Sequence, residues 1–285
     1  MPCHKNILLP GPHSLPLLTD IFLPENEKPA PVILYAHGFN GFKDWGNFDL
    51  IARQFSGAGF TFIKFNFSHN GTSPEQPDAF VNLDAYANNN YSKELDDLGA
   101  LIDWAVSPAN PFAPYIDNKH IGLIGHSLGG GIVLLKAAED KRVKAVATWA
   151  AISKCQTPWG SWPAEKMEAW KNSGVAYVTN SRTGQELPLH YQLVADFEQH
   201  RERLDIEKAV KSLRLPLLIC HGTQDPSVPF ASAQKIQSWK PDATLVAVDS
   251  DHVFGRRHPW TEPDLPPATR QVVHQTIAFF RKTLC

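Results

Sequence analysis

The stretch "HIGLIGHSLGGGIVLLKAAED" (residues 120–140) decides the fold, because its pattern changes abruptly at a single serine. Its first part, "HIGLIGHS", is an apolar run of the kind found in strands that are covered on both faces of a sheet. Its second part, from Gly129 onward, has the periodicity of a helix. Ser127 stands at the junction, between Gly125 and Gly129. The stretch therefore predicts a strand, a sharp turn with serine at its apex, and a helix.

The rest of the chain repeats this alternation of short apolar runs and helical segments. Runs typical of strands occupy residues 32–39, 60–67, 143–151, 216–223 and 244–250, and helical periodicity occupies residues 48–59, 91–107, 231–239 and 269–284. Strands that alternate with helices of this length indicate βαβ units. We therefore predict an α/β fold with a mostly parallel central sheet and helices on both of its faces.

Two regions depart from this alternation. The segment "NILLPGPHSLPLLTDIFLP" (6–24) predicts a hairpin at one edge of the sheet. Residues 152–206 are too many for one crossover helix, and they include a hairpin-like segment with a glycine turn at 175–194. Because a structureless loop of that length is uncommon in a compact domain, an inserted cap is the better interpretation. We therefore expect an α/β core from residues 1–151 and 207–285, with the cap at residues 152–206 between them.

Composition and charge exclude several classes of protein. A chain of 285 residues, 43% hydrophobic and 20% charged, suits one large globular domain. Its formal charge of −2, without a block of like charge, argues against nucleic acid or an anionic membrane as the main partner. No apolar run approaches the roughly 20 residues of a membrane span, and the first residues lack the apolar region of a secretory signal. We expect a cytoplasmic protein whose four scattered cysteines are free thiols.

Ser127 lies within Gly-His-Ser-Leu-Gly, which fits the G-x-S-x-G pattern of a nucleophile elbow. The sharp turn strains the serine backbone, so its close neighbours must be glycines, and the hydroxyl then projects above the sheet. The same letters also fit an ordinary glycine-rich turn that is packed for close backbone approach. Serine is a poor nucleophile without a base, so the rest of the chain has to supply one.

Candidates for that base and its carboxylate partner follow the last two strand-like runs. Asp225 in "HGTQDPSVP" follows the run at 216–223, and His252 in "VDSDHVFG" follows the run at 244–250. The carboxyl ends of parallel strands are where α/β sheets carry their sites, and the order Ser, Asp, His is that of one hydrolase fold. Asp249 and Asp251 compete for the carboxylate role. We favour Asp225, because a residue adjacent to the histidine is poorly placed to accept its hydrogen bond.

A third element of the predicted site is "HGFNGFKDW" (37–45), which follows the strand-like run at 32–39. The backbone N–H of Phe39 can point into the site there, and the N–H of Leu128 opens the helix that follows Ser127. Together they predict an oxyanion hole with two donors. A plain glycine turn between strand and helix is the structural alternative.

These motifs, in this order, resemble the α/β-hydrolase superfamily from about residue 30 to the C-terminus. The resemblance rests on "HGFNG", "FNFSHNGTS", "GHSLGG", "HGTQD" and "SDH", and "HGFNGFKDW" is most similar to the dienelactone-hydrolase-like and cinnamoyl (feruloyl) esterase-like branch. It implies a serine hydrolase that cleaves small to medium or aromatic acyl esters without a cofactor or metal. Ser127 would be the nucleophile, His252 the base and Asp225 its partner. Serine at position 127, in place of the cysteine of true dienelactone hydrolases, argues against dienelactone chemistry.

The inserted segment also supplies candidate substrate contacts. We expect Trp159, Trp162 and Tyr177 to contact a small-molecule ester, although packing within the insertion is the plainer role for any one of them. A peptidase or amidase, or a thioesterase, could use the same triad, and a non-catalytic ligand-binding protein could keep the fold. A homodimer is compatible with this interpretation.

Overall fold

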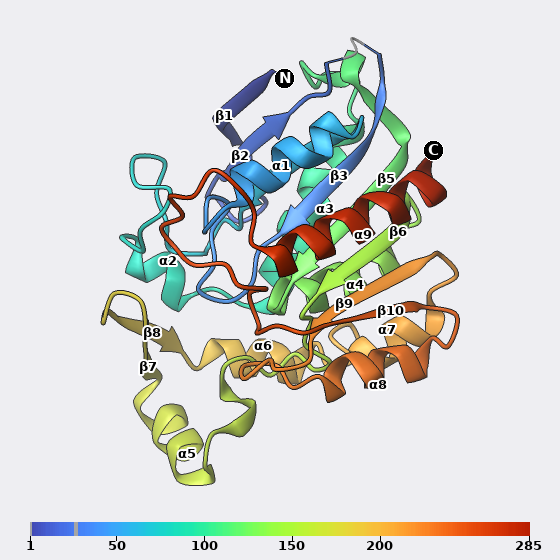
Figure 1. Ribbon diagram of the computed structural model, residues 1–285. Coiled ribbons are helices and arrows are strands. Elements are labelled where there is room, and N and C mark those ends of the chain that lie inside the picture. Colours follow the sequence, from blue (N-terminus) through green and yellow to red (C-terminus); the bar gives the residue numbers. More distant parts are fainter. Residues whose placement is uncertain (1, 26–27) are drawn as a thin grey trace.

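The computed structural model describes residues 2–25 and 28–285, which are built around a sheet of eight strands (Figure 1). In spatial order these are β1 (Cys3–Leu9), β2 (Leu17–Phe22), β4 (Thr61–Asn66), β3 (Ala30–Ala36), β5 (Ile116–His126), β6 (Val143–Trp149), β9 (Leu217–Gly222) and β10 (Thr244–Val248). Strand β2 is antiparallel to β1 and β4, and the neighbours from β4 to β10 are parallel. The predicted mostly parallel sheet with an edge hairpin is therefore confirmed.

Helices cover both faces of this sheet (Figure 1). One face carries α1 (Phe48–Gly57) and α9 (Pro267–Leu284), and the other carries α3 (Tyr91–Val106), α4 (Leu128–Glu139), α7 (Ile206–Ser212) and α8 (Ala231–Trp239). Along β3, Val32 and Leu34 pack in the cluster with α3 and α4, whereas Ile33 and Tyr35 pack in the cluster with α1 and α9. Both faces of the strand bury side chains, which explains why the strands read as continuous apolar runs.

The segment between β6 and β9 forms several short elements. These are the 3₁₀ helix η2 (Trp159–Ser161), α5 (Ala164–Ser173), β7 (Val175–Thr179), β8 (Glu186–His190), α6 (Gln192–Gln199) and α7. Strands β7 and β8 pair antiparallel, with Gly184 at φ +73° in their turn. Leu187 and Leu189 join the core cluster of the sheet, while α5 and the hairpin project from the body in Figure 1. The segment is thus folded and anchored at one end.

Sequence periodicity does not predict several of the short helices. Helices α2 (Leu83–Ala87), α5, α6 and α7 have five to ten residues, and the 3₁₀ helix η1 (Ala113–Tyr115) has three. The shortest, η1 and α2, offer too few turns for a clear apolar stripe, and α5 has Trp170 as its one buried side chain. Asn82 caps α2 and Asp205 caps α7, each by accepting a backbone N–H with its side chain. Local capping and packing therefore define these helices.

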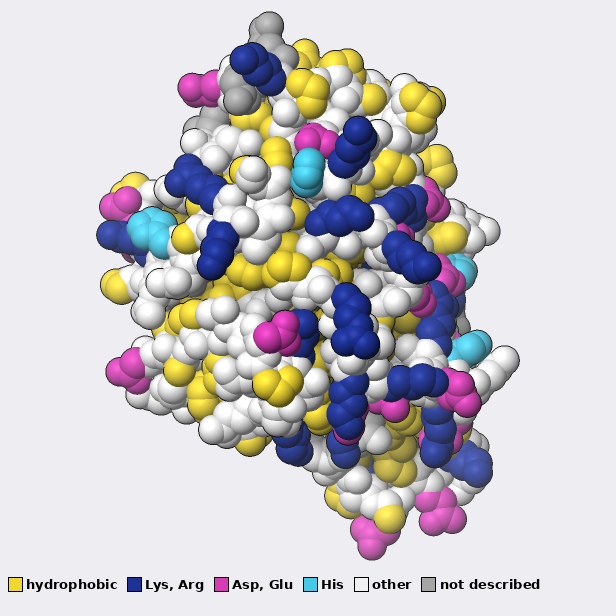
Figure 2. Space-filling model, turned by 90° about the vertical axis from the view of Figure 1, so that its right-hand side faces the viewer, with side chains coloured by type: hydrophobic (Ala, Val, Ile, Leu, Met, Phe, Trp, Pro, Cys, Tyr) yellow, Lys and Arg dark blue, Asp and Glu magenta, His cyan; other side chains and the backbone are white. Residues whose placement is uncertain are grey.

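The surface charges and the cysteines of the structure agree with the expectations from composition. On the face shown in Figure 2, Lys and Arg side chains are scattered among acidic and uncharged ones. Within residues 2–25 and 28–285, no helix is long and apolar enough to cross a bilayer. The four cysteines, all in the described ranges, are free thiols.

A buried group of charges ties the loop after β3 to the antiparallel edge of the sheet. Lys43 of that loop lies 2.8 Å from Asp20 of β2, and Lys64 of β4 lies 2.9 Å from the same carboxylate. All three side chains are 0–1% exposed. Asp44 and Asp49 complete the group by pairing with Lys64. Burial opposes the ionisation of Asp44, but Lys64 and Lys43 hold its pKa down at about 2.

Three of these carboxylates, Asp20, Asp44 and Asp49, approach one another closely enough to suggest a cation site. The ammonium groups of Lys43 and Lys64 contact them, and Lys5 pairs with Asp49 as well. Lysines therefore already neutralise the cluster, and its role is to hold chain segments together.

Asp20→Asn should destabilise the protein strongly, because it leaves two buried ammonium groups short of a counter-charge. We expect the free energy of unfolding to fall by about 3–5 kcal/mol, measured by urea denaturation. Glu202→Gln is the control, since Glu202 pairs with Lys208 at the exposed surface and should change stability by less than about 1 kcal/mol. Equal midpoints for the two variants would contradict a stabilising role of the cluster.

Candidate active site

Ser127 is held in a strained turn between β5 and α4. Its backbone has φ +55° and ψ −117°, a conformation that residues with a Cβ atom rarely adopt. Backbone hydrogen bonds fix it: the Ser127 N–H donates to the Trp149 carbonyl (2.9 Å), and the Ser127 carbonyl accepts from the N–H groups of Gly130 (3.0 Å), Gly131 (3.4 Å) and Ile152 (3.2 Å). Strand β6 and the helix therefore impose the strain together.

Steric contacts require glycine at positions 125 and 129, two residues before and two residues after Ser127. A Cβ atom on Gly125 would lie 2.2 Å from the Gly129 carbonyl oxygen, and one on Gly129 would lie 2.4 Å from the carbonyl oxygens of Ala36 and His37. Real Cβ atoms do not approach oxygen so closely. The G-x-S-x-G spacing thus reflects backbone contact within the turn and with the end of β3.

His252 and Asp225 come together at the carboxyl ends of β10 and β9. The His252 Nδ1 atom lies 2.7 Å from Asp225 Oδ2, and the two side chains are 15% and 0% exposed. Because an ionised carboxylate only accepts, Nδ1 carries the proton and Nε2 is left as a base. Burial would raise the pKa of Asp225, but hydrogen bonds from His221, His252 and the Val228 N–H keep it well below its usual range.

The two other candidate carboxylates, Asp249 and Asp251, make hydrogen bonds with other partners than the His252 ring. Asp249 Oδ1 accepts from the Gln224 side-chain amide at 2.6 Å, and Asp251 Oδ1 accepts from the N–H groups of Val253 (3.1 Å) and Gly255 (2.9 Å). Asp251 therefore shapes the turn that carries His252.

Two histidines that sequence reasoning did not assign to the site support this pair. His221, fully buried on β9, donates from Nε2 to the Val228 carbonyl (2.8 Å), and the same atom is 3.3 Å from Asp225 Oδ2. His126 donates from Nε2 to the His252 backbone carbonyl (3.0 Å), with the two rings 4.9 Å apart. In the sequence, His126 stands directly before Ser127, and His221 lies four residues before Asp225 in "CHGTQD".

The loop at residues 37–41 faces Ser127. A Cβ atom on Gly38 would lie 2.9 Å from the Ser127 Cβ, so the loop backbone passes directly beside the serine. Within the described residues, the N–H groups of Phe39 and Leu128 have no hydrogen-bond acceptor. His37 fixes the start of the loop, because its Nδ1 donates to the Gly38 carbonyl (2.9 Å) and its Nε2 accepts from the Phe67 N–H (3.3 Å).

Ser127 and His252 line one cavity of about 350 Å³. Its walls include the 37–41 loop, aromatic side chains such as Trp45 and Phe48, and residues 180–182 from the β7–β8 turn. The structure does not bring the three expected substrate contacts to this cavity. Trp159 packs against Phe197, Trp162 packs against Trp170, and Tyr177 is 54% exposed. The aromatic side chains of the insertion therefore mainly form its own core, and Tyr177 faces solvent.

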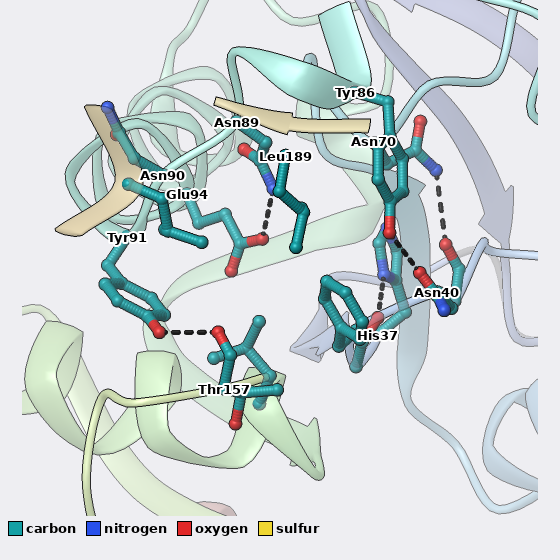
Figure 3. Close-up of a pocket in the computed structure, with 15 residues that line it drawn as sticks. His37, Asn40, Asn70, Tyr86, Asn89, Asn90, Tyr91, Glu94, Thr157 and Leu189 are labelled. Atoms are coloured by element: carbon teal, nitrogen blue, oxygen red, sulfur yellow. Dashed lines mark hydrogen bonds between the residues drawn. The ribbon is translucent and has the colours of Figure 1, made fainter. Parts of the chain in front are cut away.

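A second cavity lies against the same 37–41 loop, and it contains a buried acid, Glu94 of α3 (Figure 3). Leu128 and Leu189 form apolar parts of its wall. Asn89 donates from its side-chain amide to Glu94 Oε1 at 2.8 Å. Burial raises the pKa of Glu94 to about 8, with Asp97 adding to the shift, so the carboxyl group is largely protonated at neutral pH.

Comparison with known proteins agrees with this architecture. Residues 31–187 match the alpha/beta hydrolase fold family, and this match covers more than half of the chain. The protein therefore belongs to the alpha/beta hydrolase fold family, as its motifs predict.

Individual relatives are more distant. Over 131 residues (46% of this chain and 41% of the relative), the chain is 32% identical to an uncharacterised 31.7 kDa protein from the traX–finO intergenic region of Escherichia coli. The chain spans about two fifths of the length of the curated relatives it matches. The esterase domain of a Rhodothermus marinus protein shares the fold with a TM-score of 0.66 and 21% identity, covering 100% of both chains. Est1E from Butyrivibrio proteoclasticus, solved with ferulic acid, has a TM-score of 0.69 and 18% identity, covering 97% of this chain and 98% of its own.

The raised pKa of Glu94 should make the free energy of unfolding fall as the pH rises. Its folded-state pKa lies above that of an unfolded glutamate, so its contribution is complete below pH 4 and is lost as the pH rises through about 8. In Glu94→Gln, the free energy of unfolding should fall less between pH 5 and pH 8 than in the wild type. Asp97, whose pKa burial raises to about 7, should cause the remaining decline. Urea denaturation at several pH values measures this, and equal slopes would contradict it.

Proposed function

We propose that the protein is a serine hydrolase that cleaves carboxylic esters through an acyl-enzyme intermediate. The observation that carries the proposal is the 2.7 Å contact between His252 Nδ1 and the buried Asp225 carboxylate, at the same end of the sheet as the strained Ser127 turn. Ser127 and His252 also line one cavity, where a substrate can reach both. A nucleophile, a base and a group that orients the base are what acyl transfer by serine requires.

In the proposed reaction, the Ser127 hydroxyl oxygen attacks the ester carbonyl carbon while His252 Nε2 takes its proton. The tetrahedral intermediate then collapses, the bond to the alcohol oxygen breaks, and the imidazolium gives its proton to the departing alcohol. Water attacks the acyl-enzyme by the same route and releases the acid and the free serine. Asp225 stabilises the imidazolium in both steps and remains ionised throughout.

The proposed oxyanion hole consists of the backbone N–H groups of Phe39 and Leu128. Both lack an acceptor within the described residues, and the Leu128 N–H lies at the N-terminus of α4, where the helix dipole favours negative charge. Removing one such donor typically raises the barrier by roughly 2.7–4 kcal/mol. The Lys43 and Asp20 ion pair next to this loop would keep it in place as charge develops on the substrate oxygen.

Residues 152–206 would act as a cap over this site. Three residues of the β7–β8 turn, Asn180 to Arg182, line the Ser127 cavity although they are far from Ser127 in the chain. Asn180 holds the turn by accepting the Arg182 and Gly184 N–H groups. The turn would therefore limit the size of the substrate from the side of the insertion.

Esters are favoured over amides and thioesters because two solved proteins with this fold are described as an esterase domain and as a ferulic-acid complex. The direct test is hydrolysis of p-nitrophenyl esters from acetate to octanoate, of ethyl ferulate and of an aminoacyl p-nitroanilide. Turnover confined to the esters supports the proposal, and preference for the anilide indicates a peptidase or amidase. Absence of Ser127-dependent turnover and of labelling by a fluorophosphonate probe would indicate a binding protein instead.

Substitutions at the triad should separate it from its neighbours. Ser127→Ala should abolish both turnover and probe labelling. Asp225→Asn should lower kcat by about 10⁴-fold, because the amide no longer fixes the proton on His252 Nδ1. Asp251→Asn is the matched control: it also lies beside His252, yet its amide oxygen can still accept the turn hydrogen bonds, so kcat should change by less than about threefold. Similar losses in both aspartate variants would contradict the assignment of Asp225.

A further inference from the structure

The second cavity contains a carboxyl oxygen that the protein itself leaves without a partner. Glu94 is only 4% exposed, its Oε1 accepts from Asn89, and its Oε2 has no hydrogen-bond partner within the described residues. Leaving a buried polar atom unpaired is unfavourable, so such an atom in a cavity points to a group that is bound there. In Figure 3 the Glu94 carboxyl group faces the open space between Tyr91 and Leu189.

Most of the other polar side chains in this cavity are already satisfied. The Tyr91 hydroxyl donates to the Thr157 carbonyl (2.7 Å), and the Tyr86 hydroxyl donates to Asn40. The side-chain amide of Asn90 donates to the Gln192 side chain at 2.7 Å. Two buried atoms of this wall have no partner within the described residues, Glu94 Oε2 and Asn89 Oδ1, and of the two groups only a protonated carboxyl can donate from that atom.

The protonation of Glu94 sets the kind of ligand it can bind. No Lys or Arg pairs with it among the described residues, and burial raises its pKa to about 8. The titratable groups that face it are Asp97 on the same helix, Tyr86, Tyr91 and Cys155, and burial raises the pKa of each of these. A neutral carboxyl group donates through its O–H, so Glu94 needs an acceptor such as a hydroxyl oxygen.

The cavity lies beside the proposed oxyanion hole, where the acyl group of a substrate would bind. Leu128 and residues 37–41 line it, and residues 37–41 also line the cavity that contains Ser127. The two proposed oxyanion donors, Phe39 and Leu128, thus form part of its wall. A carbonyl oxygen that rests on these donors would therefore place its acyl carbon beside the wall that this cavity shares with the Ser127 cavity.

The size of the cavity limits that substituent. Its volume is about 30 Å³. One water molecule needs roughly 10–15 Å³ on this measure, so the space holds about two or three non-hydrogen atoms. An aromatic acyl group does not fit there, whereas a hydroxymethyl group does.

We propose that this cavity is the acyl subsite and that it selects short hydroxyacyl esters, with Glu94 donating a hydrogen bond to the acyl hydroxyl oxygen. The inference rests on the proposed function, because it assigns the acyl group of the same reaction. Glycolyl and propanoyl groups have nearly the same size, and they differ in the hydroxyl that Glu94 would bind.

The experiment compares the kcat/KM of phenyl glycolate with that of phenyl propanoate in several variants. In each variant, the kcat/KM of the glycolate is divided by that of the propanoate, and this ratio is compared with the wild-type ratio. The comparison cancels the intrinsic difference in reactivity between the two esters. Glu94→Leu, which removes the donor, should lower this ratio by about tenfold. Glu94→Gln, whose amide can still donate, should retain most of it.

Two further readouts separate recognition from a structural role. In the wild type the ratio should fall as the pH rises through about 8, because the Glu94 carboxyl group loses the proton that it donates. In Glu94→Gln the ratio should be independent of pH. Asp97→Asn is the matched control, since Asp97 is a second buried acid on α3 that does not line the cavity. The comparison is made at pH 6, because burial, the main cause of the raised pKa of Glu94, is unchanged in this variant, and the ratio there should stay as in the wild type.

The outcomes distinguish this inference from the proposed function. Ser127-dependent turnover of both esters with the same ratio in wild type and Glu94→Leu would overturn the hydroxyacyl assignment alone and indicate that ordered water fills the cavity. Absence of turnover of both esters and of the p-nitrophenyl ester series would overturn the proposed function. In that case, binding of glycolamide and propanamide to Ser127→Ala, followed by NMR, tests the cavity directly. Glycolamide binding that is lost in Ser127→Ala/Glu94→Leu would support the subsite, and equal binding of both amides would overturn it.

Discussion

The positive φ of Ser127 is the constraint on which the rest of the site depends. A residue with a Cβ atom adopts φ +55° only where its surroundings leave no alternative. Here the surroundings are the carbonyl of Trp149 on β6, the first turn of α4 and the end of β3. Because the turn is locked by the sheet and the helix together, the serine side chain is positioned before any ligand binds. Pre-positioning of this kind is what a proposed nucleophile needs.

The parallel sheet brings the other groups to the same place. Strands β3, β5, β9 and β10 are parallel, so the segments after them emerge at the same edge. These segments carry Phe39, Ser127, Asp225 and His252. Each is then held by local contacts: Lys43 pairs with Asp20, His126 donates to the His252 backbone, and Asp225 accepts two backbone N–H groups at 2.8 Å. Buried polar contacts thus help to determine where these loops lie.

The strands, the large helices and the order of the motifs could be predicted from the sequence because each rests on a local pattern. The G-x-S-x-G turn is an example, since its glycines reflect contacts within a few residues of Ser127. Contacts between distant segments have no such pattern. Nothing in the sequence marks His221 as different from an ordinary strand residue. Its place beside Asp225 depends on how the loop after β9 folds back. The substrate contacts expected of the aromatic residues in the insertion stay a prediction for a related reason, because composition cannot tell an internal core from a substrate wall.

Glu94 shows how burial can give a common side chain a specific chemical role. On an exposed helix it would be an ionised carboxylate, and no local pattern in "YSKELDD" sets it apart from its acidic neighbours. The insertion changes this, because Leu189 of β8 and Leu193 of α6 line the cavity together with Glu94. Removal of water raises the pKa of Glu94 to about 8 and converts an anion into a hydrogen-bond donor. The same segment that would limit the substrate from outside thus also sets the chemistry of the space next to the proposed oxyanion hole.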